Sequence, residues 1–339
     1  MLSLIDMDMK TDKRLSLLID WVSRFDGFSG VRAEPASADA SFRRYFRVQN
    51  GQSRIVMDAP PPQEDCRPFV AVAAYLDKMG LNSPRVLEAD LERGFLLLTD
   101  LGSTSYLSEI NAAPERADRL YRDAMDALVV MQAQGAGFQR TLPPYDEKLL
   151  RFELSLFHDW LCEKHLDITF GDEEERGWRA TCDALVRAAL SQPSVFVHRD
   201  YHSRNLMVTP ADNPGILDFQ DAVEGPYTYD LVSLLKDCYI KWPREVIRAR
   251  ARYFFGKIGR DSIDEAQFLR DFDLMGVQRH LKAAGIFARL LHRDSKTGYL
   301  KDVPRTLSYV TDVTGEYDEL RFLGDFVANR VIPALGEAG

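Results

Sequence analysis

Residues 195–230 constrain the fold of this chain more than any other stretch. They read V-F-V-H-R-D-Y-H-S-R-N-L-M-V and, after a turn rich in Pro, Asp and Asn, G-I-L-D-F-Q-D-A-V-E-G-P-Y-T-Y-D. The opening apolar triplet predicts a short buried strand that leads to Asp200. Two further apolar runs, at 206–208 and 215–217, predict the strands of a hairpin. The second strand of this hairpin leads directly to Asp218.

The polar residues of this stretch match the needs of phosphoryl transfer from ATP. That reaction needs a carboxylate beside the attacking hydroxyl, and oxygen ligands that hold Mg²⁺ against the phosphates. Asp200 is the expected catalytic carboxylate, and Asn205 and Asp218 are the expected metal ligands. Their order follows the kinase pattern H-R-D-x-x-x-x-N and D-F-G, with Gln220 at the glycine position. A lone loop aspartate is more often a cap or turn former, but four residue types at this spacing favour a kinase.

These motifs resemble the aminoglycoside phosphotransferase and choline kinase superfamily, through His198, Asp200, Asn205, Asp218 and the string G-P-Y-T-Y-D-L. Within it, F-V-H-R-D-Y-H-S-R-N-L-M and L-D-F-Q-D-A-V-E-G-P-Y-T-Y-D-L-V-S-L-L-K-D look most like the anomeric N-acetylmuramate/N-acetylglucosamine kinases of bacterial cell-wall recycling. The strings A-D-A-S-F-R-R-Y-F-R and Q-R-H-L-K-A-A-G-I-F-A-R-L extend the resemblance over nearly the whole chain. In the superfamily the counterparts of His198 and Asp230 support the catalytic loop, so we expect both to be structural.

The resemblance implies an α+β, bilobal, protein-kinase-like fold, with a five-stranded antiparallel sheet in the small lobe and a larger, mostly helical lobe. We expect an N-terminal helix within residues 1–28, a small nucleotide-binding lobe at 29–100, and a helical lobe with the catalytic loop and acceptor site at 101–339. Hydrophobic periodicity supports this division. Strands are predicted at 31–35, 42–48, 54–58, 85–89 and 95–99. Helices are predicted at 15–27, 69–80, 114–134, 149–166, 173–190, 229–239, 244–256, 263–292 and 304–334.

The expected nucleotide site departs from the kinase pattern at one position. If residues 55–58 are aligned with the kinase motif V-A-I-K, Asp58 replaces the lysine that contacts the phosphates. An aspartate there would repel ATP unless it faces away, pairs with a cation or lies near a metal. The following helix carries no glutamate partner for such a lysine, although Glu64 precedes it. We expect Arg43 or Arg44 to take over the phosphate contact; the alternative is that both are solvated strand residues.

Two further segments are expected to contact ATP. The small-residue loop 36–41 lies where kinases carry a glycine-rich loop over the phosphates, and it offers the hydroxyl of Ser41. Leu98, Thr99 and Asp100 lie at the position of the hinge between lobes, where backbone groups would bond the adenine. For the leucine, plain strand core is the alternative.

The acceptor site is less constrained by the sequence. The residues expected to bind substrate flank the catalytic groups and are His202, Arg204, Gln220, Asp221 and Glu224. The acidic ones could bond sugar hydroxyls or serve the amines of an aminoglycoside or choline. An N-acetylmuramate acceptor carries a carboxylate, which favours a cation nearby. The candidates for that cation are Arg204, Arg279, His280, Arg289 and Arg293, and each is alternatively a surface or capping charge.

Composition narrows the partners and the compartment. The chain of 339 residues has a net charge of -9, which argues against nucleic acid as a partner. No apolar run reaches membrane-spanning length. Four dispersed cysteines favour reduced thiols over a metal site or a disulfide framework. The opening residues lack the features of a signal peptide, so we expect a cytoplasmic protein with a small-molecule substrate.

Three functions remain open at this point. The resemblance implies an ATP- and Mg²⁺-dependent kinase acting on the anomeric (C1) hydroxyl of N-acetylmuramate and/or N-acetylglucosamine. Its product would be a sugar 1-phosphate that passes to a nucleotidyltransferase in peptidoglycan recycling. The second function is an aminoglycoside, choline or other small-alcohol kinase of the same fold. The third is a nucleotide-binding pseudokinase, suggested by the missing lysine and opposed by the intact base and metal residues.

Overall fold

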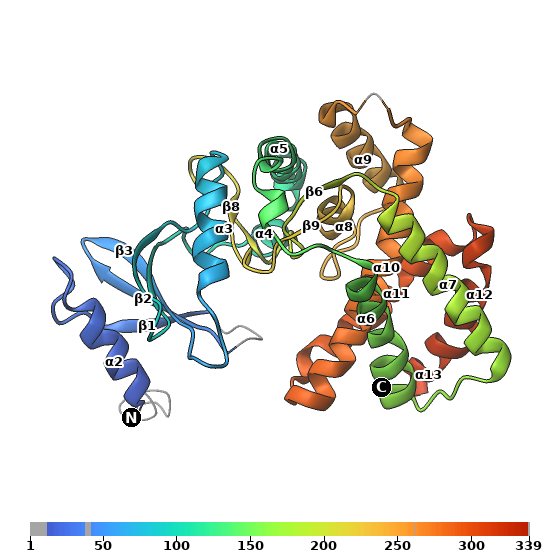
Figure 1. Ribbon diagram of the computed structural model, residues 1–339, viewed down its shortest axis with the longest axis horizontal. Coiled ribbons are helices and arrows are strands. Elements are labelled where there is room, and N and C mark those ends of the chain that lie inside the picture. Colours follow the sequence, from blue (N-terminus) through green and yellow to red (C-terminus); the bar gives the residue numbers. More distant parts are fainter. Residues whose placement is uncertain (1–11, 38–41, 261, 338–339) are drawn as a thin grey trace. The chain divides into compact units, whose positions relative to one another are not determined.

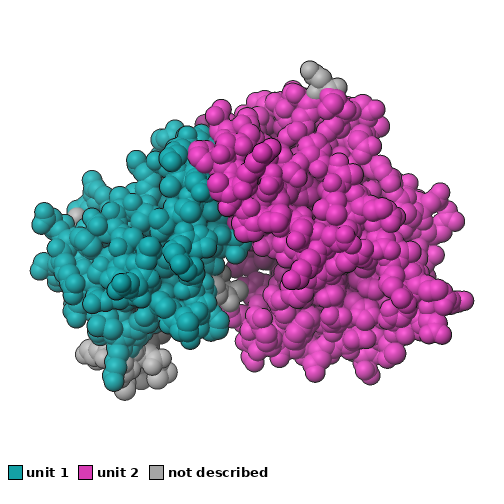
Figure 2. All heavy atoms as spheres, in the orientation of Figure 1, with its two compact units in different colours: residues 1–105, 206–221 teal, residues 106–205, 222–339 magenta. Residues whose placement is uncertain are grey.

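The computed structural model describes residues 12–37, 42–260 and 262–337. The predicted contact at Ser41 lies outside these residues. The chain forms two compact units, coloured separately in Figure 2. The first comprises Met1–Ser105 and Leu206–Asp221, and the second comprises Tyr106–Asn205 and Ala222–Gly339. The hairpin that leads to Asp218 therefore belongs to the first unit.

The first unit is built on an antiparallel five-stranded sheet with the strand order β1-β2-β3-β5-β4 (Figure 1). Its strands are β1 (Ala33–Ser37), β2 (Arg44–Asn50), β3 (Gln52–Asp58), β4 (Val86–Asp90) and β5 (Phe95–Thr99). β2 and β3 form a hairpin around Gly51, whose φ of 70° is a conformation that glycine adopts without strain. The expected five-stranded antiparallel sheet is confirmed.

Helix α2 (Lys13–Val22) packs on one face of this sheet. Asp12 caps the helix by accepting the backbone N–H groups of Arg14 and Leu15. The shared core is formed by Leu15, Leu18, Trp21 and Val22 of the helix with Phe46, Val48, Val56, Phe95 and Leu97 of the sheet. Each such side chain contributes about 1.5–3 kcal/mol when it is fully buried. The N-terminal helix is therefore an integral part of the first unit.

Helix α3 (Arg67–Lys78) packs beside β4 and buries its own apolar stripe. The ring of Phe69 at its start lies 4.7 Å from that of Phe219. Phe219 follows the small hairpin of β7 (Leu206–Met207) and β8 (Gly215–Ile216). The contact fixes the segment that carries Asp218 against α3.

The second unit is mostly helical. Its helices are α4 (Tyr106–Ala112), α5 (Ala117–Gly135), α6 (Glu147–Leu156), α7 (Asp172–Leu190), α8 (Tyr229–Leu235), α9 (Arg244–Ile258), α10 (Glu265–Asp294), α11 (Val303–Thr314), α12 (Arg321–Phe326) and α13 (Ile332–Glu337). Two strands, β6 (Ser194–Val197) and β9 (Val223–Pro226), pair antiparallel. The helix α6 continues as a π-helical segment over Phe157–His165. The mostly helical character expected for this part of the chain is confirmed.

Helix α10 is the central element of the second unit. It is 30 residues long, is buried along most of its length, and contacts α6, α7, α8, α9 and α11. At Gly285 it approaches the end of α6 so closely that an added Cβ would lie 2.2 Å from the carbonyl carbon of Leu156. Only glycine permits this approach, so α10 fixes the position of α6.

Three predicted helices differ from the observed ones. The helix expected at 15–27 ends at Val22, and the residues after it form turns. The helix expected at 229–239 ends at Leu235. The residues after it are not helical, and one of them, Asp237, binds a neighbouring loop through its carboxylate. The single helix expected at 304–334 is three helices, α11 to α13, with the first break at Gly315. Hydrophobic periodicity alone does not show where these helices end or break.

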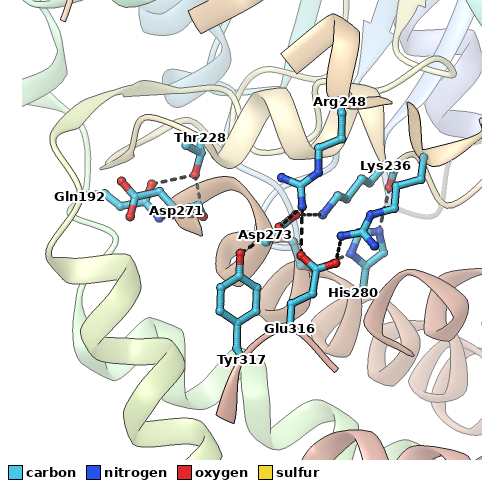
Figure 3. Close-up of polar contacts among 11 residues, drawn as sticks. Gln192, Thr228, Lys236, Arg248, Asp271, Asp273, His280, Glu316 and Tyr317 are labelled. Carbon is cyan, nitrogen blue, oxygen red and sulfur yellow. Dashed lines mark hydrogen bonds and ion pairs between the residues drawn. The ribbon is translucent and has the colours of Figure 1, made fainter. Parts of the chain in front are cut away.

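Both ends of α8 are tied to α10 by polar contacts, which Figure 3 shows. Just before the helix, the Thr228 hydroxyl donates to Gln192 at 2.7 Å, and the Gln192 amide donates to the backbone oxygen of Asp271 at 3.2 Å. Just after it, the Lys236 ammonium lies 2.9 Å from the Asp273 carboxylate. Both ends of this short helix are therefore held in place.

Asp273 joins two further segments at the same point. Its carboxylate also accepts from Arg248 of α9 at 2.5 Å and from the hydroxyl of Tyr317 at 3.0 Å. The carboxylate and the Lys236 ammonium are both almost fully buried. Removing one partner of a buried ion pair costs about 3–5 kcal/mol. This cluster therefore fixes the C-terminal end of α8.

Candidate active site

The catalytic loop begins directly after β6 and is braced by Asp230 of α8. The Asp230 carboxylate accepts the backbone N–H of His198 at 2.7 Å and that of Arg199 at 2.9 Å. Burial raises the pKa of Asp230 to about 7, although these two hydrogen bonds act in the opposite direction. Arg199 has a φ of 77°, which is strained for a residue with a side chain. The brace from Asp230 holds this strained backbone in place.

A second buried aspartate holds the other end of the loop. The Asp237 carboxylate accepts the backbone N–H of Ser203 at 3.0 Å and also binds its hydroxyl. Its other oxygen accepts the N–H of Tyr239 at 2.9 Å. The sequence analysis assigned no role to Asp237, although it follows Asp230 by seven residues in the quoted motif. The catalytic loop is thus fixed at both ends from α8 and the residues after it.

The backbone of Asp200 is held between two side chains. Its N–H donates to Nδ1 of His198 at 3.2 Å, and its carbonyl oxygen accepts from Nδ2 of Asn205 at 3.0 Å. Asn205 uses its amide nitrogen in this contact, so Oδ1 is the atom of that side chain which suits a metal. The loop therefore fixes Asp200 and orients Asn205 together.

Positive groups surround the Asp200 carboxylate. Burial opposes its ionisation, but the neighbouring groups outweigh burial and lower the pKa of Asp200 below its ordinary value. Lys282 has the largest effect, and Arg199 and Arg279 add to it; His202 contributes only in its protonated form. A carboxylate that stays ionised can accept a hydrogen bond from a hydroxyl and take its proton.

Glu153 of α6 organises two of these cations. It is almost completely buried, lies 3.0 Å from the Lys282 ammonium and forms an ion pair with Arg199. Lys282 also donates to the hydroxyl of Tyr229 at 2.9 Å. One carboxylate thus faces two cations, and the remaining positive charge favours the ionised form of Asp200. The roles of Glu153 and Lys282 were not predicted from the sequence.

Asp218 lies in the first unit, at the end of the small hairpin. Its φ of 62° is left-handed, a conformation that aspartate adopts more readily than most residues. The Gln220 amide donates to Asp218 at 3.0 Å and to Asp221 at 3.1 Å. Gln220, which replaces the kinase glycine, thus holds two carboxylates. Nη2 of Arg43 lies 3.9 Å from Oδ1 of Asp218.

The donors on the two predicted metal ligands suit Mg²⁺. Asn205 offers an amide oxygen and Asp218 a carboxylate oxygen, and Mg²⁺ takes oxygen ligands. The left-handed Asp218 and the oriented Asn205 amide are both local arrangements that fix a donor. Each residue by itself therefore offers the type of donor that the implied ion takes.

Asp58 is explained by a structural role. Its side chain is fully buried and accepts from Nε of Arg14 at 2.6 Å and from Nη2 of Arg44 at 2.5 Å. Asp58 and Val56 lie two residues apart in β3, so both face α2. Arg44 also forms an ion pair with Asp12, the residue that caps α2. The position of the kinase lysine is thus used to attach the N-terminal helix.

The predicted hinge residues are largely engaged in the sheet. Leu98 pairs with β3 and β4, and the N–H of Thr99 donates to the carbonyl of Arg85 at 3.0 Å. Asp100 accepts from Nε of Arg47 at 2.6 Å. Burial opposes the charge on Asp100, but hydrogen bonds, that from Arg47 above all, prevail and lower its pKa. An adenine contact at Leu98–Asp100 stays a prediction, and the N–H of Thr99 is already used.

The predicted acceptor residues of the second unit have different surroundings. Arg204 is exposed, and its guanidinium lies over the rings of Tyr239 and Tyr299, at 4.7 and 5.9 Å from their centres. Burial lowers the pKa of His202, which favours its neutral form. Glu224 lies in β9 and accepts from the Gln139 amide at 3.1 Å. Arg204 is the one of the three that presents a cation at the surface.

Two other candidate cations are occupied elsewhere. His280 is fully buried, and its ring nitrogens face the backbone oxygens of Gly276 and Lys236. Burial lowers the pKa of His280 to about 3, against the effect of these two backbone oxygens, and the buried ring is not available as the cation expected for it. Arg293 forms an ion pair with its neighbour Asp294 at 2.9 Å.

Comparison with known proteins identifies the family. The profile of the phosphotransferase enzyme family matches residues 32–269. The chain belongs to this family. It is 51% identical over 301 residues to the N-acetylmuramate/N-acetylglucosamine kinase of Pseudomonas aeruginosa, with 87% of each chain covered. It is 48% identical over 298 residues to the enzyme of the same name from Pseudomonas putida, with 86% of each chain covered. The suspected resemblance is confirmed, and the protein is a small-molecule kinase.

The fold of this chain is also similar to that of a solved structure with much lower sequence identity. A choline kinase from Streptococcus pneumoniae superimposes with a TM-score of 0.61 at 11% identity, covering 88% of this chain and 98% of that one. This likeness concerns the fold alone, and it confirms the protein-kinase-like architecture. Within the described residues, none of the helices is long and apolar enough to cross a membrane.

Proposed function

We propose that this kinase transfers the γ-phosphate of ATP to the C1 hydroxyl of N-acetylmuramate and/or N-acetylglucosamine. The observation that carries the proposal is the 51% identity over 87% of the chain to a kinase named for these two sugars. The product would be a sugar 1-phosphate, which a nucleotidyltransferase could consume in peptidoglycan recycling. The four free, buried cysteines favour a reducing compartment, so we place the reaction in the cytoplasm.

Asp200 is the proposed catalytic base. The C1 hydroxyl of a reducing sugar is more acidic than an ordinary alcohol, so a weak base suffices to orient it and take its proton. The lowered pKa keeps Asp200 ionised for this purpose, and the backbone contacts from His198 and Asn205 fix its position. In phosphoryl transfer most of the rate enhancement comes from such positioning and from charge neutralisation.

Asn205 and Asp218 are the proposed ligands of Mg²⁺. When bound, the ion would neutralise phosphate charge. This chain's own contribution is to fix the two donors, through the Asn205 amide contact to Asp200 and the Gln220 contact to Asp218. Asp230 and Asp237 in turn hold the loop that carries Asn205.

Arg204 is the proposed contact for the carboxylate of N-acetylmuramate. The neighbouring tyrosine rings restrain its guanidinium, which lowers the entropy lost on binding an anion. His202, Gln220, Asp221 and Glu224 remain proposed contacts for the acceptor. Because N-acetylglucosamine lacks this carboxylate, Arg204 would act on one sugar and not on the other.

The first test is the choice of acceptor. ADP release is measured with ATP, Mg²⁺ and each of N-acetylmuramate, N-acetylglucosamine, kanamycin and choline, with Asp200→Asn as the control. We expect turnover with the amino sugars alone, and at least a 100-fold loss in the variant, about 3 kcal/mol of transition-state stabilisation. Turnover with kanamycin or choline instead would refute the proposed substrate and leave the kinase fold intact.

A further inference from the structure

The phosphate-binding cation can be chosen between two neighbouring arginines. Arg43 and Arg44 are adjacent in the chain, but their guanidinium groups have different partners. Arg44 is bound to Asp58 and Asp12, where the N-terminal helix attaches. We propose that Arg43 is the cation that contacts the phosphates of ATP and that Glu64 restrains it. The inference rests on ATP as the donor in the proposed function.

Arg43 lies among acidic groups at the end of the small hairpin. Its Nη2 is 3.9 Å from Asp218 and its Nε is 3.8 Å from Glu64, and its side chain is only 10% exposed. An arginine guanidinium stays protonated in proteins. A permanent positive charge therefore lies within 4 Å of the carboxylate that is proposed to hold the metal.

This placement is suited to a phosphate group. The guanidinium is a planar fork of N–H donors that matches phosphate oxygens. Close to Asp218, it would bind phosphate beside the metal ion that this carboxylate is proposed to hold. In protein kinases a lysine on the third strand has this task, and here that position is occupied by the buried Asp58.

Glu64 takes the part that a helix glutamate has in protein kinases. There, an ion pair with the glutamate keeps the phosphate-binding lysine in place. Here the Glu64 carboxylate lies 3.8 Å from Arg43 and also accepts the backbone N–H of Phe42 at 3.2 Å. It thus ties the cation to the chain just before β2. Glu64 precedes α3 in the sequence, and α3 itself contains no glutamate.

Nucleotide binding without any sugar tests the inference. Dissociation constants for ATP, ADP and adenosine are measured by calorimetry on the full chain and on two variants, Arg43→Ala and its matched control Arg44→Ala. We expect Arg43→Ala to weaken ATP binding by about 10- to 100-fold, the range for one charge-assisted hydrogen bond, with adenosine binding changed less than about twofold. Arg44→Ala should lower the melting temperature and keep the ratio of ATP to adenosine affinity.

Three outcomes would overturn the inference. They are equal weakening of ATP and adenosine in Arg43→Ala, no weakening of either, and a selective loss of ATP in Arg44→Ala. Arg43→Lys keeps the charge and provides a second variant, for which ATP affinity should fall between those of the wild type and Arg43→Ala. A wild-type protein that binds ATP no better than adenosine would refute ATP as the donor as well. An error in the proposed sugar would change none of these constants.

Discussion

Replacing Asp58 by lysine would restore the residue of protein kinases, yet we expect it to damage this protein. The buried Asp58 carboxylate accepts from Nε of Arg14 at 2.6 Å and from Nε and Nη2 of Arg44 at 3.0 and 2.5 Å. Asp58→Lys would put a third cation between two arginines, in a place that water does not reach. The milder Asp58→Asn removes the charge and keeps the shape, so its effect on the free energy of unfolding measures what the charge contributes.

The expected loss follows from the exposure of the partners. Each hydrogen bond to a charged group contributes about 1.5–3 kcal/mol. The Arg14 and Arg44 side chains are 30% and 38% exposed, so water can replace part of what is lost. We therefore expect Asp58→Asn to lower the free energy of unfolding by about 2–4 kcal/mol, and Asp58→Lys to lower it further.

Urea unfolding followed by circular dichroism gives this free energy, and hydrogen exchange on the amides of α2 shows where the loss occurs. Asp65→Asn is the matched control, because Asp65 is exposed and pairs with Arg67 at the surface; it should change the free energy by less than about 0.5 kcal/mol. The reasoning is refuted if Asp58→Asn is no more destabilising than this control. It is also refuted if Asp58→Lys binds ATP more tightly than the wild type.

Three further substitutions test the site. Lys282 lowers the pKa of Asp200, so Lys282→Met should move the acid limb of the pH profile of kcat/KM to higher pH. Lys282→Arg keeps the charge and should leave the limb in place. An unmoved limb in both variants would contradict the role of Lys282 in keeping Asp200 ionised. Asp230→Ala leaves two backbone N–H groups without their acceptor. It should lower the free energy of unfolding in urea by about 2–4 kcal/mol and also lower kcat. A variant as stable as the wild type would contradict the bracing role of Asp230. Arg204→Met should lower kcat/KM for N-acetylmuramate about tenfold and leave N-acetylglucosamine within about twofold, and a parallel loss on both sugars would exclude the carboxylate contact.

Local patterns in the sequence were enough to predict much of the fold. β5 has the predicted ends, at Phe95 and Thr99, because an apolar run bounded by turn residues is a local signal. The helix predicted at 173–190 is observed as α7, Asp172–Leu190, because its apolar residues recur at helical spacing, which is also a local signal. The predicted start of α8 at Tyr229 is confirmed, but its end at Leu235 was not predictable in this way. That end depends on a buried contact to α10, a helix that begins thirty residues after α8 ends.

The residues of the candidate site were likewise predictable only where local sequence patterns identify them. Asp200, Asn205 and Asp218 could be named because their spacing carries the chemistry of phosphoryl transfer. The roles of Glu153 and Lys282 could not be named, since the two lie 129 positions apart. Glu153 is in none of the quoted strings, and Lys282 lies in Q-R-H-L-K, a string that carries no known chemistry by its spacing. A signal for Glu153 did exist, because it occupies the apolar face of a helix between Leu150 and Leu154, which are both buried.

The role of Asp58 could also be predicted only in part. The sequence indicated that an aspartate in place of the lysine must face away or pair with a cation. The partner that settles this is Arg14, 44 residues earlier, in a helix whose contact with the sheet is not visible in the sequence. The distinction between Arg43 and Arg44 depends on the same contact.

The position of the transferred phosphate tests the central claim most directly. ³¹P NMR of the products formed from ATP with N-acetylmuramate and N-acetylglucosamine, alongside their C1 methyl glycosides, identifies the atom that is phosphorylated. We predict a phosphate coupled to the anomeric proton for the free sugars, and no product from the methyl glycosides or with Asp200→Asn. A phosphate on another hydroxyl, or turnover of a methyl glycoside, would contradict the proposed anomeric kinase.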